Sequence, residues 1–284
     1  MAQFTNQAQL SYNNSIVNSN VAVGEILEVL SASKTAVMDD YTRNDDVTYV
    51  ISVVNSGTSA VTGLTVTDNL GAYTFGTETV YPLAYVEGSV RMYINGVLQP
   101  APTVTPGPPL VFGGINLPAG SNLMLIYEAD VTRFAPLDIA DSIVNTATVT
   151  GTGLPSTITV SETVTPEQAP ELTITKFIEP VPVTENGTLT YRFLIQNYGN
   201  TAAVATDNLA VTDTFDPILS NLTVALNGTP WTEGTEYTYD GTTGLFVTVP
   251  GGITVPAATY TQDADTGAWI VTPGVTTLVV TGTV

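Results

Sequence analysis

Residues 47–57 read VTYVISVVNSG, and residues 189–199 read LTYRFLIQNYG, so one pattern occurs twice in a chain of 284 residues. In both copies a large apolar or aromatic side chain stands at every second position, which is the period of a half-buried β-strand. An Asn and a Gly close each copy, and these residues indicate a turn. The repeat therefore predicts two domains with the same β fold.

The repeat extends beyond this strand in both directions. Before it stand Lys34 in the first copy and Lys176 in the second, and these are the only two lysines of the chain. After it, LTVTD ends at Asp68 and LAVTD ends at Asp213. The two lysines therefore occupy the same position in two copies of one domain.

Many short strands separated by Gly, Pro and Asn turns are typical of an immunoglobulin-like sandwich. We expect an all-β protein with two such sandwiches in tandem, at residues 14–161 and 171–284. The stretch ETVTPEQAP, within residues 162–170, reads as the linker between them.

The two copies end differently. The first contains a strand at residues 142–150, SIVNTATVT, whereas the second stops after TTLVVTGTV at Val284. The second sandwich is therefore expected to lack its last strand, which would leave unpaired strand edges and an apolar groove.

A counterpart of the missing strand stands at the front of the chain. The pattern Asn-x-Ala-x-Leu at residues 6–10 matches Asn-x-Ala-x-Val at residues 145–149. We predict that residues 1–13 form a donor strand that completes the second sandwich. Its contact residues are Phe4, Asn6, Ala8 and Leu10.

By strand alternation Lys34, Asp68 and Asn145 all point inward among apolar neighbours. A buried charge is costly unless it is paired or neutralised. Burial lowers the pKa of a lysine amine, which makes the amine a nucleophile, and a neighbouring carboxylic acid can exchange protons with it. Attack of such an amine on an Asn amide releases ammonia and leaves an isopeptide bond, with no cofactor.

The order K…YxIxVxNxG…VTD…NTATV resembles the repeat family called domain of unknown function 11, which occurs in tandem in bacterial surface and spore-appendage proteins. The Lys, Asn and acid set is also similar to the self-crosslinking domains of Gram-positive pili and adhesins. The resemblance implies two isopeptide bonds, Lys34–Asn145 and Lys176–Asn6.

For the catalytic acid the resemblance implies Asp68 in the first copy and Asp213 in the second. Glu128 is an alternative in the first copy, but the aligned position of the second copy is Thr281, so the matched aspartates are preferred. An ordinary salt bridge beside a hydrogen-bonded Asn is the other interpretation of the set.

The partner of Lys176 is Asn6 of the same chain or of a neighbour. A neighbour is easier to reach, because the first domain lies between the two residues in the chain. Head-to-tail donation does not close unless the rotation permits, so it builds a fibre. We therefore predict a structural subunit of an extracellular filament on a cell or spore surface, whose partners are copies of itself.

Two other functions stay open, a monomeric adhesin and a carbohydrate-binding surface module that uses Trp231 and Trp269. The formal charge of −20 disfavours nucleic acid as a partner, and no apolar stretch is long enough for a membrane helix. The chain has no Cys and no His, so a turnover enzyme and a metal centre are not expected. The loop Asp263–Gly267 resembles half of a calcium loop and reads as a solvated turn.

Overall fold

The computed structural model describes residues 2–26, 28–43, 45–152, 154 and 156–284, and these residues form β-strands with one short 3-10 helix, Ala205–Asp207. The chain divides into two compact units. The first contains residues 1–136 and 142–165, and the second contains residues 137–141 and 166–284. The all-β prediction is therefore confirmed.

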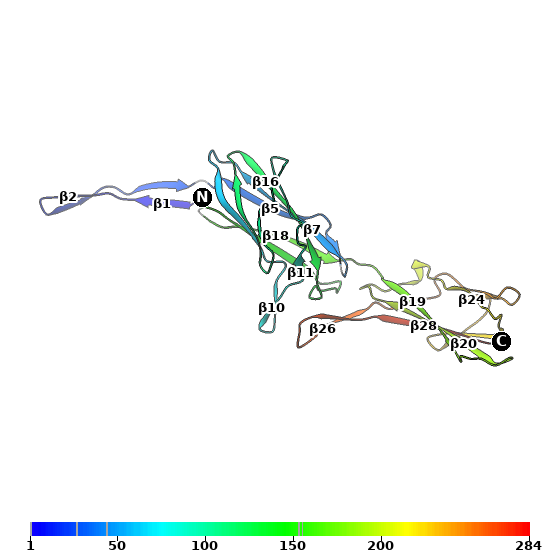
Figure 1. Ribbon diagram of the computed structural model, residues 1–284. Helices are drawn as coiled ribbons and strands as arrows, with labels where there is room; N and C mark the ends of the chain where they lie inside the picture. Colours follow the sequence, from blue (N-terminus) through cyan, green and yellow to red (C-terminus); the bar gives the residue numbers. More distant parts are fainter. Residues whose placement is uncertain (1, 27, 44, 153, 155) are drawn as a thin grey trace. The chain divides into compact units, whose positions relative to one another are not determined.

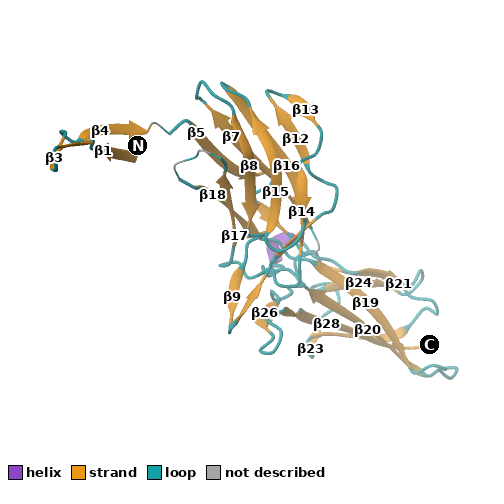
Figure 2. Ribbon diagram, turned by 60° about the vertical axis from the view of Figure 1, so that its left-hand side comes forward, coloured by secondary structure: helices purple, strands orange, loops and turns teal. Residues whose placement is uncertain are grey.

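The first sandwich, called domain 1, has two sheets (Figure 2). In one sheet the order is β13 (Val97–Gln99), β12 (Arg91–Ile94), β16 (Ser121–Val131), β7 (Asp46–Asn55) and β5 (Leu30–Ala36), with β11 (Leu83–Tyr85) also on β16. In the other the order is β14 (Thr103–Thr105), β15 (Leu110–Leu117), β8 (Val61–Asp68), β17 (Ile143–Thr150), β18 (Ile158–Pro166) and β6 (Asp40–Tyr41). A small hairpin, β9 (Tyr73–Phe75) with β10 (Glu78–Val80), stands apart from both sheets.

The core of domain 1 follows the alternation that the sequence predicts. Along β7 the side chains of Tyr49, Ile51 and Val53 are fully buried, and Val50 and Ser52 between them are not. On β16, Leu125 and Tyr127 pair with Ile51 and Tyr49 and are equally buried. One face of each strand is therefore apolar and faces the opposite sheet.

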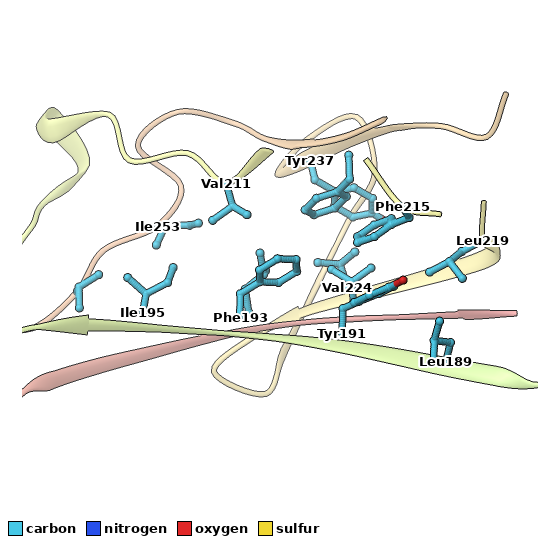
Figure 3. Packing of buried hydrophobic residues seen from close by; sticks show 14 of the residues in the cluster. Leu189, Tyr191, Phe193, Ile195, Val211, Phe215, Leu219, Val224, Tyr237 and Ile253 are labelled. Atoms are coloured by element: carbon cyan, nitrogen blue, oxygen red, sulfur yellow. The ribbon is translucent and has the colours of Figure 1, made fainter. Parts of the chain in front are cut away.

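The second sandwich, called domain 2, repeats this arrangement. One sheet has the order β19 (Leu172–Glu179), β20 (Thr188–Asn197), β28 (Gly274–Thr283), β22 (Ser220–Leu226) and β23 (Thr229–Trp231). The other contains β21 (Thr212–Thr214), β25 (Leu245–Thr248) and β24 (Tyr237–Asp240), and β26 (Thr259–Gln262) pairs with β27 (Trp269–Thr272). Its core gathers Tyr191, Phe193 and Ile195 of β20 against Phe215 and Val211 (Figure 3).

Two equivalent turns support the repeat at atomic detail. The buried Asn55 side chain donates to the carbonyl oxygen of Pro118 at 3.0 Å and accepts from the Gly57 amide at 3.0 Å. Asn197 donates to the Pro256 carbonyl at 3.0 Å and accepts from the Gly199 amide at 2.9 Å. The same side chain therefore closes the same turn in both domains.

The two domains differ beside β8 and its counterpart β21. In domain 1, β8 has β15 on one side and β17 on the other, and β18 follows β17. In domain 2, β21 pairs with β25 alone among the strands that the structure describes. We predicted that one strand is missing; among the described strands, both β17 and β18 are without a counterpart beside β21.

The N-terminal segment is a hairpin and not a single strand. Strand β1 (Ala2–Asn6) pairs with β4 (Ala22–Ile26), and β2 (Gln9–Tyr12) pairs with β3 (Ser15–Asn18) (Figure 1). Residues 2–26, called the arm, are thus one two-stranded unit. We predicted that residues 1–13 form the donor and that residue 14 begins the first sandwich; residues 15–26 belong to the arm instead, and the sandwich begins at β5.

The predicted linker is also too long. Strand β18 continues to Pro166 and pairs with β17 as far as Val164, so the first residues of the 162–170 stretch are part of domain 1. Only residues 167–171 separate β18 from β19. Glu162 is a charged residue on the inward side of this strand. It interrupts the alternation of apolar and polar residues by which the strand could have been recognised in the sequence.

Candidate crosslinking site

The site of domain 1 centres on an ion pair between its two sheets. Lys34 of β5 and Asp68 of β8 contact each other at 2.6 Å, from Nζ to Oδ2, and both side chains are fully buried. Burial lowers the pKa of Lys34 to about 8, although the charges of Asp68 and Glu162 oppose the shift. The amine is therefore much closer to its neutral, nucleophilic form than an exposed lysine is.

Tyr127 of β16 links this pair to Asn145 of β17. The Tyr127 hydroxyl donates to Oδ2 of Asp68 at 2.6 Å, and Nδ2 of Asn145 donates to the Tyr127 hydroxyl at 3.3 Å. Burial raises the pKa of Tyr127, so the hydroxyl keeps its proton. The structure thus brings Lys34, Asp68 and Asn145 into one hydrogen-bonded cluster, as predicted from alternation.

The carbonyl oxygen of the Asn145 amide faces a backbone donor. The amide of Gly71 donates to Oδ1 of Asn145 at 3.3 Å. Gly71 has a φ of +68°, and a Cβ at this position would lie 2.5 Å from Cγ2 of Ile143, so only glycine fits. A donor at this oxygen would stabilise the negative charge that develops there when an amine attacks the amide carbon.

The positions of Glu128 and Asp68 bear on which of them is the candidate acid. Glu128 follows Tyr127 on β16, points to the outer face of the sheet and is exposed. Asp68 instead contacts the lysine directly and is fully buried. The preference for Asp68 over Glu128 is therefore supported by position, and its role in catalysis stays a prediction.

Domain 2 contains the same ion pair in a different setting. Lys176 of β19 contacts Asp213 of β21, but the Lys176 side chain is 40% exposed and that of Asp213 is 18% exposed. The amine also lies 4.4 Å from the ring centre of Tyr191. At the place of Tyr127, domain 2 has the buried Val280, which pairs with Tyr191 as Tyr127 pairs with Tyr49.

The inward face of β19 is open to solvent. Ile174, Lys176 and Ile178 lie opposite the buried Ile195, Phe193 and Tyr191 of β20, so they share the core-facing side. Ile174 is nevertheless 56% exposed and Ile178 is 46% exposed. We call this surface the open face; it consists of Leu172, Ile174, Lys176 and Ile178 together with Asp213.

The predicted partner of Lys176 lies in the arm. Asn6 of β1 pairs with Ala22 of β4, and its side chain is exposed. The other predicted contact residues, Phe4, Ala8 and Leu10, are exposed as well. A bond between Asn6 and Lys176 therefore stays a prediction.

The remaining candidate residues lie elsewhere in domain 2. Trp231 packs against the core of domain 2, and Trp269 lies in the separate β26–β27 hairpin. Oδ1 of Asp263 accepts hydrogen bonds from the amide and the hydroxyl of Thr266, and these bonds lower the pKa of Asp263. The loop that resembles a calcium site is thus the turn of that hairpin.

Two further observations concern only the residues that the structure describes. Three or more Asp or Glu side chains do not gather anywhere among them in a way that could hold a metal ion. None of their helices is long and apolar enough to cross a membrane.

Tyr127 is the residue of the cluster that we did not predict. It stands at an inward position of β16, in the alternation of Leu123, Leu125 and Tyr127. The repeat gave no signal for it, because the second copy has Val280 at that position. A buried Tyr hydroxyl usually forms a hydrogen bond with a polar group. This rule could have indicated that Tyr127 contacts the polar residues of the cluster.

No family model and no curated protein matches the sequence. Similar solved structures include BcpA, the major pilin subunit of Bacillus cereus, at 12% identity, with 96% of this chain and 73% of that chain covered and a TM-score of 0.38. The pilus backbone RrgB from Streptococcus pneumoniae is similar at 12% identity, with 86% and 55% covered and a TM-score of 0.36. The collagen adhesin CNA from S. aureus is similar at 10% identity, with 55% of each chain covered and a TM-score of 0.31. This chain thus spans little more than half of the last two structures, and at such identities the similarity concerns the fold alone.

Proposed function

We propose that this chain is the structural subunit of a head-to-tail filament on a cell or spore surface. The arm of one subunit fills the open face of domain 2 in the next subunit, and an isopeptide bond between Asn6 and Lys176 makes the joint covalent. A second bond, between Lys34 and Asn145, crosslinks domain 1 within each subunit. The location at a surface rests on the family resemblance of the repeat.

One observation carries the proposal. Domain 2 has the lysine and the aspartate of the domain 1 site, and among the described strands none pairs with β21 in the place of the asparagine-bearing β17. The arm bears an asparagine in the same sequence pattern. Phe4 is 52% exposed and Leu10 is 64% exposed, and the open face exposes Ile174. Burying each such side chain stabilises a joint by about 1.5–3 kcal/mol.

The chemistry balances without a cofactor. The lone pair of the Lys176 nitrogen attacks the side-chain amide carbon of Asn6, and a new C–N bond forms. The bond from that carbon to the original amide nitrogen breaks, and ammonia leaves. Asp213 takes a proton from the amine and passes a proton to the leaving nitrogen. Each site reacts once, so this is self-crosslinking and not turnover.

Assembly between chains is tested with purified protein that is boiled in detergent, run on a gel and weighed by intact mass spectrometry. We expect a ladder of multimers in which each joint is lighter than the separate chains by one ammonia. Protein that remains a monomer of calculated mass under all assembly conditions would refute the proposal.

A matched pair of variants locates the joint. Asn6→Ala should abolish the ladder, because the joint loses its amide carbon. Asn145→Ala should keep the ladder and remove only the ammonia loss within domain 1. A ladder that persists in Asn6→Ala would show that Asn6 is not the joint residue.

A further inference from the structure

We infer that the arm docks as an intact two-stranded hairpin, with β1 in the position of β17 and β4 in the position of β18. This inference rests on the proposed function and specifies how many strands one subunit supplies to the next. A single donor strand would leave half of the gap in domain 2 unfilled.

The gap is two strands wide. The second sheet of domain 1 continues from β8 through β17 to β18. Strands β17 and β18 form an antiparallel hairpin. In domain 2 the sheet ends at β21, the counterpart of β8, among the described strands. An added strand on β21 alone would itself present a new unpaired edge.

The register of the arm matches the register of that hairpin. Asn145 lies opposite Glu162, and Asn6 lies opposite Ala22. Two residues before Asn145, Ile143 lies opposite Val164. Two residues before Asn6, Phe4 lies opposite Gly24. The reactive asparagine therefore has the same relation to the second strand in both hairpins.

The inward face of the arm is built from both strands. A Cβ on Gly24 would lie 2.3 Å from the ring of Phe4, so the Phe4 ring covers Gly24 and would have to move for a larger residue. At the equivalent place in domain 1, Ile143 and Val164 are both buried. The Phe4 ring, which covers Gly24, thus provides the apolar surface that the Ile143 and Val164 side chains provide in domain 1.

The opposite face of the arm is suited to water. Gln3 donates to the Glu25 carboxylate at 3.2 Å across the two strands. In domain 1 the outer face of the β17–β18 hairpin carries a similar polar pair, Thr146 and Ser161, whose hydroxyls are 2.9 Å apart. Docking as a hairpin therefore leaves the Gln3–Glu25 pair outside, together with Thr5 and Val23, and turns Phe4 inward.

The match covers β1 and β4 and then ends. Beyond Asn6 the arm shifts by one residue, so that Gln9 lies opposite Asn18, and the Ser19 amide donates to the Ala8 carbonyl at 2.8 Å. The β17–β18 hairpin has no such shift between Ile143 and Val149. In domain 1 the residues of β17 that pair with β8 are 147–150, which correspond to residues 8–11 of the arm. The matching register therefore holds at Asn6 and before it, and pairing with β21 falls on the part of the arm that follows.

The connections to the following domain agree as well. Residues 167–171 lie between β18 and β19, and residues 27–29 lie between β4 and β5. A docked hairpin would therefore be followed by the next sandwich after a comparably short stretch of chain. A single donor strand would instead leave residues 13–29 unpaired between two subunits.

A disulfide lock tests the inference, because the chain has no cysteine of its own. Two double variants are made, Thr5→Cys with Val23→Cys and Gln3→Cys with Glu25→Cys, whose positions lie opposite each other on the outer face. Intact mass identifies the oxidised form. A locked arm cannot separate into single strands, so oxidised subunits should form the ladder to the same extent as reduced ones if the hairpin docks whole.

The outcomes separate the inference from the proposed function. A ladder that forms after reduction and is lost after oxidation would overturn hairpin docking and leave the filament intact. A ladder absent in both states would overturn the filament itself. Failure of both cysteine pairs to oxidise would show that the arm is not this hairpin.

A second variant tests the same point without a disulfide. Gly24→Val places a branched side chain against the Phe4 ring, and such overpacking should slow ladder formation by about tenfold or more. Val23→Thr, on the outer face of the same strand, is the matched control and should assemble normally. Normal assembly of Gly24→Val would overturn the inference, since residue 24 would then lie outside the joint.

Discussion

Lys176 of β19 forms an ion pair with Asp213 of β21, and this pair joins the two sheets of domain 2 while the lysine side chain remains 40% exposed. The equivalent pair of domain 1, Lys34 with Asp68, is fully buried and belongs to a cluster with Tyr127 and Asn145. The same Lys–Asp ion pair is thus present in a buried form and in a partly exposed form within a single chain.

Replacing the acid should stop the chemistry without preventing docking. We expect Asp213→Asn subunits to associate in native buffer and to separate in boiling detergent, because removal of a general acid and base costs about 10²–10⁴ in rate. Native and denaturing gels on the same samples measure this difference. Asp216→Asn, at an exposed position, is the control. A full covalent ladder from Asp213→Asn would exclude Asp213 as the acid.

The pH dependence of the domain 1 bond has a defined sign. Below about pH 8 the Lys34 amine holds its proton, and passing that proton along its 2.6 Å contact with Asp68 would give the neutral amine beside a proton donor. As pH rises through about 8 this proton is lost and the acid can no longer serve. The rate of bond formation should therefore fall above pH 8.

This rate is measured on protein refolded from denaturant at a series of pH values, with ammonia loss followed by intact mass in the Asn6→Ala background. A rate that rises through pH 8 and stays high would mean that Lys34 needs only to be deprotonated. The role of Asp68 as an acid would then be wrong.

Tyr127→Phe should affect domain 1 alone. It removes the hydroxyl that donates to Asp68 and accepts from Asn145, and the loss of the bond from the buried Nδ2 of Asn145 costs about 1–3 kcal/mol. Calorimetry should show a lower melting temperature, and refolded protein should form the domain 1 bond more slowly. The ladder should be unchanged, because domain 2 has Val280 at this place. Tyr93→Phe on β12 is the matched control.

Leu10→Asp should block assembly and leave the subunit folded. Leu10 is 64% exposed in the arm, so the free subunit loses little when it becomes charged. In the joint the same change forfeits about 1.5–3 kcal/mol of apolar burial and also buries a charge, which weakens docking at least tenfold. Gln9→Asp, its exposed neighbour, is the control. An equal drop in melting temperature and in ladder yield would point to a role in folding instead.

The sequence predicted most of the fold because one strand pattern occurs twice. The alternation at residues 47–53 and 189–195 identified core and surface, and the structure buries the expected side chains. The boundaries were less accurate. The Asn13-Asn14 pair, where both residues have positive φ, is the turn between β2 and β3 and could have indicated a hairpin arm.

For the site, strand alternation identified which side chains point inward, and it placed Lys34, Asp68 and Asn145 there. It could not show which inward groups touch, since Tyr127 reaches Asp68 from a strand in the opposite sheet. A contact of this kind depends on how two sheets pack, and local sequence carries little information about it.

The sequence by itself determined the repeat and the shared position of the two lysines. These properties follow from the period of a β-strand, which is a local property of the chain. Only the tertiary structure decided that β17 and β18 have no counterpart beside β21 among the described strands, and that the arm is a hairpin. It also decided that the Lys176 side chain is exposed to solvent whereas the Lys34 side chain is buried. Pairing between strands far apart in sequence and the exclusion of water both depend on packing, so they become visible only once the chain is folded.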